Sequence, residues 1–278
     1  MNRLTSTAIV GALLALTGSA LAQPGPGDAQ QAGDPSASTV QAPPPAMVPV
    51  ATEIDQGVVD DALSPGAFFA PTALTEPAGT LSASAGGFAN TGLDSAVLSH
   101  VSLSYAATNQ LSISGTLALP GQLDGVTIGA LSAKAQVYRA GRVRVGLQGN
   151  LLFATGSGDA IFAGLVGAAA TLCLDDACNS YASGFAALGI YKSSSTGLPV
   201  IISGSAAVQL VPHLKLVAEL VTGFLTSEVG GIGNGAVLFY GLRGTHANVG
   251  VDVGAATTLG VGNDETVLLA TVTARFKP

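Results

Sequence analysis

The sequence predicts an all-β protein: a transmembrane antiparallel up-and-down β-barrel of about twelve strands, with short periplasmic turns and longer outer loops. Three observations lead to this prediction. The composition is that of a membrane protein, but the chain beyond its N-terminus lacks an apolar run long enough for a spanning helix. Segments of about ten residues alternate between apolar and polar positions. The connections between these segments alternate between long and short.

The composition is strongly apolar. Hydrophobic residues make up 48% of the chain and charged residues only 10%, whereas a soluble domain usually carries roughly a quarter charged residues. Gly and Ser interrupt every stretch that approaches the ~18 apolar residues of a spanning helix. A closed β-barrel is the other structure that a bilayer permits, because all of its backbone hydrogen bonds are internal. The net charge of −7 excludes a nucleic-acid partner, which needs a basic face.

The N-terminus predicts export. Arg3 provides a short positive region, residues 8–16 (AIVGALLAL) form an apolar core, and Ala20-Leu21-Ala22 is a signal-peptidase site. The composition then divides the rest of the chain. The expected parts are a signal peptide at 1–22, a Pro/Gly/Ala-rich disordered linker at 23–50, a periplasmic lead-in with a candidate short helix at 51–78, and the barrel at 79–278.

Twelve alternating segments follow the lead-in, and most have the length that a tilted membrane strand requires. An even number of strands is typical of single-chain bacterial barrels and places both termini on the periplasmic side. The segments are 79–88, 96–106, 109–119, 127–138, 142–154, 160–172, 179–191, 198–210, 214–224, 236–243, 248–256 and 266–276.

The stretch 127–151 shows the alternation most clearly. Its polar positions all fall on one side if the turn is Arg139-Ala140-Gly141, which places Tyr138 opposite Arg142 and Gly141 where a left-handed residue is favoured. In a membrane barrel the apolar side faces lipid and the polar side lines the interior. Aromatic residues near the segment ends are expected at the membrane interface. They are Phe88, Tyr105, Tyr138, Phe153, Phe162, Tyr181, Tyr191, Phe224, Phe239 and Tyr240.

Two segments resemble a known class of protein. The hairpin VSLSYAATNQLSISGTLALP (101–120) looks like those of uncharacterised bacterial outer-membrane β-barrel proteins of the porin-like class, and TVLLATVTARF (266–276) resembles their C-terminal targeting strand. The resemblance covers roughly residues 68–276. It implies a location in the outer membrane, contact with outer-membrane lipid, and assistance from the barrel-assembly machinery during biogenesis. Oligomeric state is not implied, and a monomer is favoured.

The expected interior face carries more cations than anions, which favours anions in a pore. We therefore expect a narrow, weakly selective, anion-leaning passive pore for small solutes. A non-conducting barrel with a structural or surface-interaction role is the alternative, because the same charges can pair and fill the interior. The candidate lumen-lining residues are Lys134, Arg142, Arg144, Lys215, Glu219, Arg243, Asp252 and Arg275.

Two cysteines, Cys173 and Cys178, occupy one of the short-turn positions. In an exported protein this spacing favours a disulfide over a metal site, since no His lies nearby. No metal and no cofactor are expected.

An enzyme is not expected. His100 and Ser102 form a His-x-Ser pair similar to that of outer-membrane lipid A deacylases, but the following strand offers Gln110 in place of the acid that would orient the His. A barrel enzyme acting on lipid is therefore the least favoured function. A soluble secreted β-sandwich remains as the alternative fold.

Overall fold

The computed structural model describes residues 71–90, 97–120, 127–155, 160–192, 196–227, 232–259 and 266–276. The predicted signal peptide, the linker and the lead-in up to residue 70 lie outside these ranges. Among the described residues, no helix is long and apolar enough to cross a membrane. The strands are β1 (Leu81–Asn90), β2 (Val97–Ala106), β3 (Leu111–Pro120), β4 (Thr127–Ala140), β5 (Val143–Thr155), β6 (Ile161–Cys173), β7 (Tyr181–Lys192), β8 (Thr196–Val211), β9 (Leu214–Ser227), β10 (Ile232–His246), β11 (Val249–Leu259) and β12 (Thr266–Phe276).

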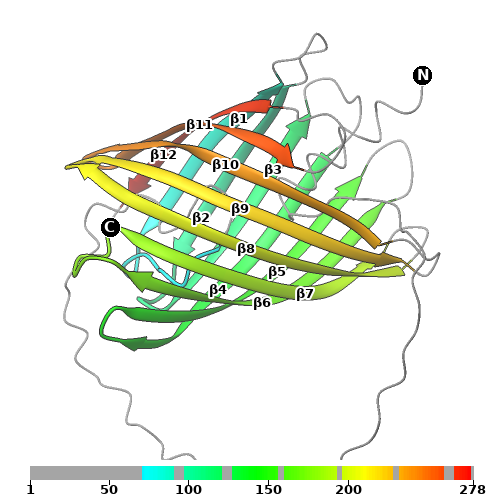
Figure 1. The fold of residues 1–278 in the computed structure, drawn as a ribbon, viewed down its shortest axis with the longest axis horizontal. Coiled ribbons are helices and arrows are strands. Elements are labelled where there is room, and N and C mark those ends of the chain that lie inside the picture. Colours follow the sequence, from blue (N-terminus) through cyan, green and yellow to red (C-terminus); the bar gives the residue numbers. More distant parts are fainter. Residues whose placement is uncertain are drawn as a thin grey trace, which may run out of the picture.

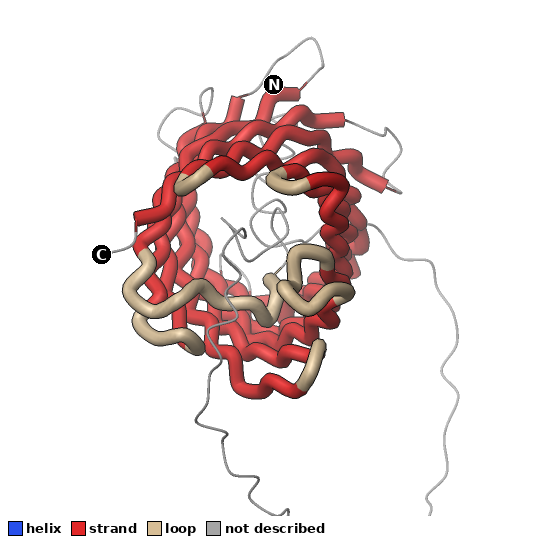
Figure 2. The backbone as a smooth tube through the Cα atoms, turned by 90° about the vertical axis from the view of Figure 1, so that its left-hand side faces the viewer, coloured by secondary structure: helices blue, strands red, loops and turns tan. Residues whose placement is uncertain are grey.

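The twelve strands form one closed antiparallel barrel (Figures 1 and 2). Each strand pairs with its neighbours in sequence, and β1 pairs with β12 through partners that run from Leu81↔Phe276 to Asn90↔Val267. Closure satisfies the backbone groups that a sandwich would leave at its sheet edges. The predicted barrel and strand count are confirmed, and the alternative of a β-sandwich is wrong.

The connections differ in part from those expected. Turns at 107–110, 141–142, 174–180, 212–213 and 247–248 lie at one end of the barrel, here called the short-turn end; the opposite end is called the loop end. Strands β8, β9 and β10 are longer than their alternation predicted. The loop-end connections beside them, 193–195 and 228–231, are correspondingly shorter than expected.

The turn between β4 and β5 was predicted incorrectly. Gly141 and Arg142 form a two-residue turn, so that Arg139 lies opposite Arg144 and Tyr138 opposite Val145. A β-bulge between Gln136 and Tyr138 then shifts the register by one residue, and bulges are common at the rims of barrels. Because of the bulge, Lys134 still faces Gln148 on the polar side. The left-handed conformation predicted for Gly141 is confirmed, with φ +51°.

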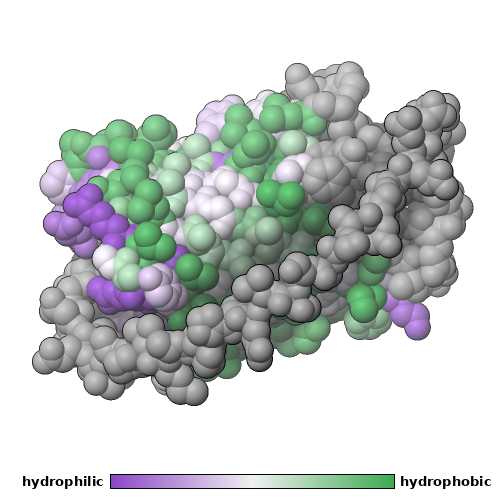
Figure 3. All heavy atoms as spheres, turned by 60° about the horizontal axis from the view of Figure 1, so that its bottom comes forward, coloured by the Kyte–Doolittle hydropathy of each residue, from purple (hydrophilic) through white to green (hydrophobic). Residues whose placement is uncertain are grey.

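The outer wall of the barrel is apolar. Every strand has large hydrophobic side chains that are exposed on the outside of the barrel. Examples are Val166 at 67%, Leu188 at 69% and Leu151 at 63%. Figure 3 shows hydrophobic side chains over the wall and a hydrophilic patch at the short-turn end. A contiguous exposed apolar surface of this extent is unfavourable in water and suits contact with hydrocarbon.

Residues 71–80 form a strap that crosses the inside of the barrel at the short-turn end (Figure 2). The backbone N–H of Ala73 donates to Thr171 Oγ1 on β6 at 2.9 Å. Farther along, the Ala78 N–H donates to Asn109 Oδ1 at 2.7 Å, in the turn after β2. The strap therefore crosses the interior from β6 to the β2–β3 turn before it enters β1. Of the predicted lead-in, only this final part is described.

Candidate functional site

The inner face of the barrel has two zones. Charged side chains, with Thr and Ser, lie in the halves of the strands nearer the short-turn end, while apolar side chains dominate nearer the loop end. On any one strand the inward residues are every second residue, as the strand period requires. Along β10, for example, Val237 and Phe239 precede Arg243 and Thr245, and all four are buried.

The best-formed charge pair joins two neighbouring strands. Arg243 on β10 and Asp252 on β11 are direct cross-strand partners. The guanidinium donates from Nε to Asp252 Oδ1 at 2.7 Å and from Nη2 to Oδ2 at 3.1 Å. The two side chains are 5% and 11% exposed. A bidentate, desolvated pair of this kind fixes both side chains against the wall and leaves little net charge toward the interior.

Lys215 and Glu219 face inward on the adjacent strand β9, and both are buried. Lys215 is the cross-strand partner of Arg243, and its Nζ lies 3.5 Å from Asn179 Oδ1. Two cations side by side are stabilised only if acids lie close to them, and Asp252 and Glu219 supply this negative charge. The four residues therefore form a compact and nearly neutral charge cluster on β9–β11.

A second charge cluster contains an acid that the sequence analysis missed. Glu76 of the strap is buried; it accepts hydrogen bonds from Ser82 Oγ at 2.8 and 3.0 Å, and it lies 3.5 Å from Arg275 Nη2 on β12. Arg275 itself faces inward and is buried. Glu76 lies in the irregular segment before the first strand, so no strand alternation could assign it to the interior.

Two further predicted residues lie on the inner wall of the β4–β5 hairpin. Lys134 is partly exposed and lies opposite Ser112 and Gln148. Arg144 is buried next to the turn, and its Nη1 donates to the carbonyls of Gly141 and Val143. Arg144 is thus directed at the rim of the short-turn end, while Lys134 lies deeper in the interior.

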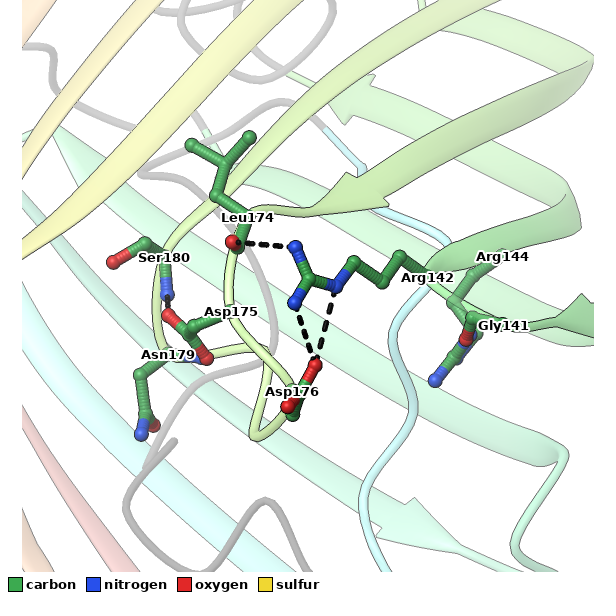
Figure 4. A network of polar contacts seen from close by, with 8 residues as sticks. All are labelled: Gly141, Arg142, Arg144, Leu174, Asp175, Asp176, Asn179 and Ser180. Atoms are coloured by element: carbon green, nitrogen blue, oxygen red, sulfur yellow. Dashed lines mark hydrogen bonds and ion pairs between the residues drawn. The ribbon is translucent and has the colours of Figure 1, made fainter.

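Arg142 does not line the interior, in contrast to the prediction. It lies in the β4–β5 turn, because that turn is Gly141-Arg142 instead of the expected residues 139–141. Its guanidinium donates to Asp176 Oδ1 and to the Leu174 carbonyl (Figure 4). Asp176 belongs to the loop closed by the predicted disulfide between Cys173 and Cys178, which is present. Asp175 accepts hydrogen bonds from the Asn179 and Ser180 N–H groups and organises the same loop.

We expect the Arg142→Ala variant to lose less than about 1 kcal/mol of unfolding free energy, because exposed ion pairs are screened by water. The side chains of Arg142 and Asp176 are 55% and 91% exposed. The midpoint of urea unfolding in detergent measures the effect. A loss of several kcal/mol would show that the contact holds the disulfide loop in place.

One part of the inner wall carries neutral polar groups. Ser84 and Ser102 pair at 2.6 Å between their hydroxyl oxygens, as do Ser114 and Ser132. On β5, Gln148 donates to Asn150 Oδ1 at 2.8 Å. These inward side chains on β1–β5 are partly accessible to solvent, whereas most of those on β6–β11 are buried. The partly accessible set, called the polar wall, is Ser84, Ser102, Ser104, Ser112, Ser114, Thr116, Ser132, Gln136, Gln148 and Asn150.

The opposite zone is an inner apolar ring, which the sequence analysis did not anticipate. Its members form one cluster of contacting side chains and come from β1 and β5–β12, with Ala130 of β4, Ala163 and Val267 packed against it. Phe88 and Phe239, predicted at the membrane interface, belong to this ring and face inward. The ring comprises Phe88, Leu152, Leu165, Ala169, Phe185, Ala187, Ile201, Val221, Val237, Phe239, Ala256 and Leu269, and Ala73 of the strap belongs to the same cluster.

His100 and Ser102 do not form a catalytic arrangement. Ser102 is hydrogen-bonded to Ser84, and the His100 ring contacts Phe88 with centroids 5.7 Å apart. The cross-strand partners of His100 are Gly86 and Ala118, so neither neighbour supplies an orienting carboxylate. Among the described residues, no group of three or more His, Cys, Asp or Glu side chains is placed to hold a metal ion.

Fold and interior together define the class: a closed twelve-stranded antiparallel barrel with an apolar exterior and a partly polar interior. No family model matches the sequence, and no curated protein matches it. Solved structures share the fold. The COG4313 outer membrane channel from Pseudomonas putida F1 matches with a TM-score of 0.57 and 11% identity, covering 73% of this chain and 97% of that chain. The NanC porin matches with a TM-score of 0.53 and 8% identity, covering 70% and 98%.

The KdgM porin gives a similar result, with a TM-score of 0.51 and 11% identity over 70% of this chain and 99% of that chain. Each of these barrels is matched over almost its whole length, and the part of this chain left over corresponds to its N-terminal region in size. At identities this low the likeness concerns the fold, and residue roles are argued from this chain alone.

Proposed function

We propose that this protein is an outer-membrane barrel that acts as a narrow passive pore for small solutes. The observation that carries the proposal is the combination of an exposed apolar outer wall with a polar wall inside that solvent reaches. The first suits lipid and the second suits an aqueous path. The names of the similar structures, a channel and two porins, support the same function.

The interior of the barrel carries a small excess of positive charge. Lys134, Arg144, Lys215, Arg243 and Arg275 are offset by Glu76, Glu219 and Asp252, and two of the acids are bound in ion pairs. Because most of this charge is neutralised locally, we propose only a slight preference for anions among the ions that pass. Reversal potentials in a KCl gradient measure this preference.

A non-conducting barrel is the second candidate, and the strap is the observation that favours it. The strap crosses the interior and is tied to it by Ala73, Glu76 and Ala78. If the strap closes the path under all conditions, the barrel has a structural or surface role.

Two measurements test the proposed function. We expect the full chain to be recovered in the outer-membrane fraction and to migrate differently on gels before and after heating, because closed barrels resist detergent until heated. Recovery in the soluble periplasmic fraction would contradict the location. We also expect purified protein in planar bilayers to give discrete conductance steps, and an absence of steps from wild type and from variants altered in the interior alike would contradict the pore.

A further inference from the structure

The inner apolar ring extends over β1 and β4–β12. Phe88 lies opposite Leu269 across β1 and β12. Val237 lies opposite Val221 across β10 and β9. On β2 and β3 the same level is occupied by the partly exposed His100, whose ring contacts Phe88, and by the buried Ala118, which lies opposite both His100 and Ile128. Any solute that moves along the barrel axis therefore passes this ring.

Two glycines allow large members of the ring to lie along the wall. A Cβ on Gly167 would come within 2.6 Å of the Phe185 ring, and one on Gly189 within 2.8 Å of Leu165 Cδ2. Leu165 and Gly189 are direct cross-strand partners. The bulky side chains therefore cover the glycines on the neighbouring strand, so their faces line the passage and their ends do not project across it.

The ring members among the described residues carry no ionisable group. The charged clusters lie on the short-turn side of it, where Arg243 pairs with Asp252 and Arg275 pairs with Glu76. An ion that enters the ring exchanges its hydration shell for hydrocarbon, which is costly, and hydrophobic constrictions are known to oppose ion flow by dewetting. An apolar solute instead gains by leaving water for the same surface.

The polar wall continues the path toward the short-turn end; its members are uncharged, and Lys134 lies between them, opposite Ser112 and Gln148. Ser84–Ser102 and Ser114–Ser132 form hydroxyl pairs on adjacent strands, and Gln148 and Asn150 extend the polar surface onto β5. Neutral donors and acceptors bind hydroxyl or carbonyl groups of a solute without requiring charge. An uncharged molecule with a few polar groups can thus leave the ring along this wall.

From these observations we propose that the inner apolar ring is the selectivity filter of the barrel. It holds back hydrated ions and admits uncharged small molecules with a largely apolar surface, and Val221 and Val237 are specificity-determining residues within it. The proposal rests on the proposed pore function and adds to it a substrate class.

The test uses valine-to-threonine substitutions, which keep the side-chain shape and add one hydroxyl. The ring variant is Val221→Thr/Val237→Thr, a cross-strand pair that faces inward. The control variant is Val251→Thr/Val272→Thr, a cross-strand pair of the same type on the exposed outer wall. Retention of the heat-dependent gel shift verifies that each full-length variant folds.

Two readouts are expected to move in opposite directions. In planar bilayers with KCl, the ring variant should conduct about tenfold more than wild type, which corresponds to a barrier lower by about 1.4 kcal/mol. In whole cells, the uncharged apolar probe N-phenyl-1-naphthylamine should enter faster with the wild-type barrel than without it. Its entry should be slower with the ring variant than with wild type. The control variant should match wild type in both assays.

The outcomes separate the two proposals. If wild type and ring variant both give channel steps of similar size, the pore stands and the ring is not the filter. If the ring variant changes ion flow and probe entry in the same direction, the ring controls width alone and the substrate class is wrong. If steps are absent from every variant, including one in which the strap is released by Glu76→Gln and Thr171→Val, both proposals fail.

Discussion

Asp252→Ala is expected to lower the free energy of unfolding by about 3–5 kcal/mol, the loss that follows when one partner of a buried ion pair is removed. Asp252 binds Arg243 through both of its carboxylate oxygens, and the Arg243 side chain is 5% exposed. Without the carboxylate, a buried guanidinium loses its bidentate partner and lies next to Lys215, a second cation on β9. The urea-unfolding midpoint, followed by the heat-dependent gel shift, measures the loss.

The double variant Arg243→Met/Asp252→Leu is the control. It removes both charges and keeps side chains of similar volume, and replacement of a buried pair by apolar residues is often neutral or stabilising. We therefore expect the double variant to be much more stable than Asp252→Ala. If Asp252→Ala instead costs less than about 1 kcal/mol, as an exposed pair does, water inside the barrel solvates Arg243 and the cluster is part of an aqueous path.

Prediction of the strands from the sequence succeeded because lipid and interior impose opposite demands on successive residues. In β12, the exposed Leu268, Val272 and Phe276 alternate with inward residues that end in Arg275, and the predicted bounds match those observed. The period of two is strict wherever one face of the strand meets water or charged groups. This alternation made it possible to predict the number of strands, their antiparallel order and the closure of the barrel.

The β4–β5 turn shows what periodicity cannot resolve. A bulge near Val137 restores the alternation after a two-residue turn, so the polar faces coincide as they would with a three-residue turn. The pattern on each strand is the same in both cases. Arg142 was consequently placed inside, although it lies in the turn and binds Asp176.

The inner apolar ring escaped sequence analysis for a related reason. Where both faces of a strand are apolar, as in Val237-Leu238-Phe239-Tyr240, alternation carries no information about which residues face inward. An aromatic residue there fits the membrane interface and the interior equally well. The sequence does contain one signal: apolar and polar positions alternate less strictly between 157 and 210, the region that holds Leu165, Ala187 and Ile201. An apolar interior explains this weaker alternation, but imprecise strand bounds explain it equally well.

Release of the strap is expected to raise ion conductance severalfold. Glu76→Gln weakens the contacts with Ser82 and Arg275, and Thr171→Val removes the acceptor of the Ala73 N–H while preserving side-chain shape. A hydrogen bond to a charged group contributes about 1.5–3 kcal/mol, and every 1.4 kcal/mol changes a population ratio about tenfold. The released strap should therefore populate an undocked state that leaves the short-turn end open. Conductance in planar bilayers measures the change, and the outer-wall variant Val251→Thr/Val272→Thr, which touches neither the strap nor the interior, should leave it unaltered.

The converse experiment locks the strap. The Cβ of Ala73 and a Cβ built on Gly146 are 3.4 Å apart, close to the separation that a disulfide needs. Ala73→Cys/Gly146→Cys should hold conductance below that of wild type under oxidising conditions, and a reductant should restore it. Wild type treated with the same reductant accounts for reduction of Cys173–Cys178. Because locking and release act on the same ten residues, opposite effects on conductance would identify the strap as the element that closes the short-turn end. Equal conductance in the locked, released and wild-type proteins would place the limiting barrier elsewhere, with the inner apolar ring as the remaining constriction.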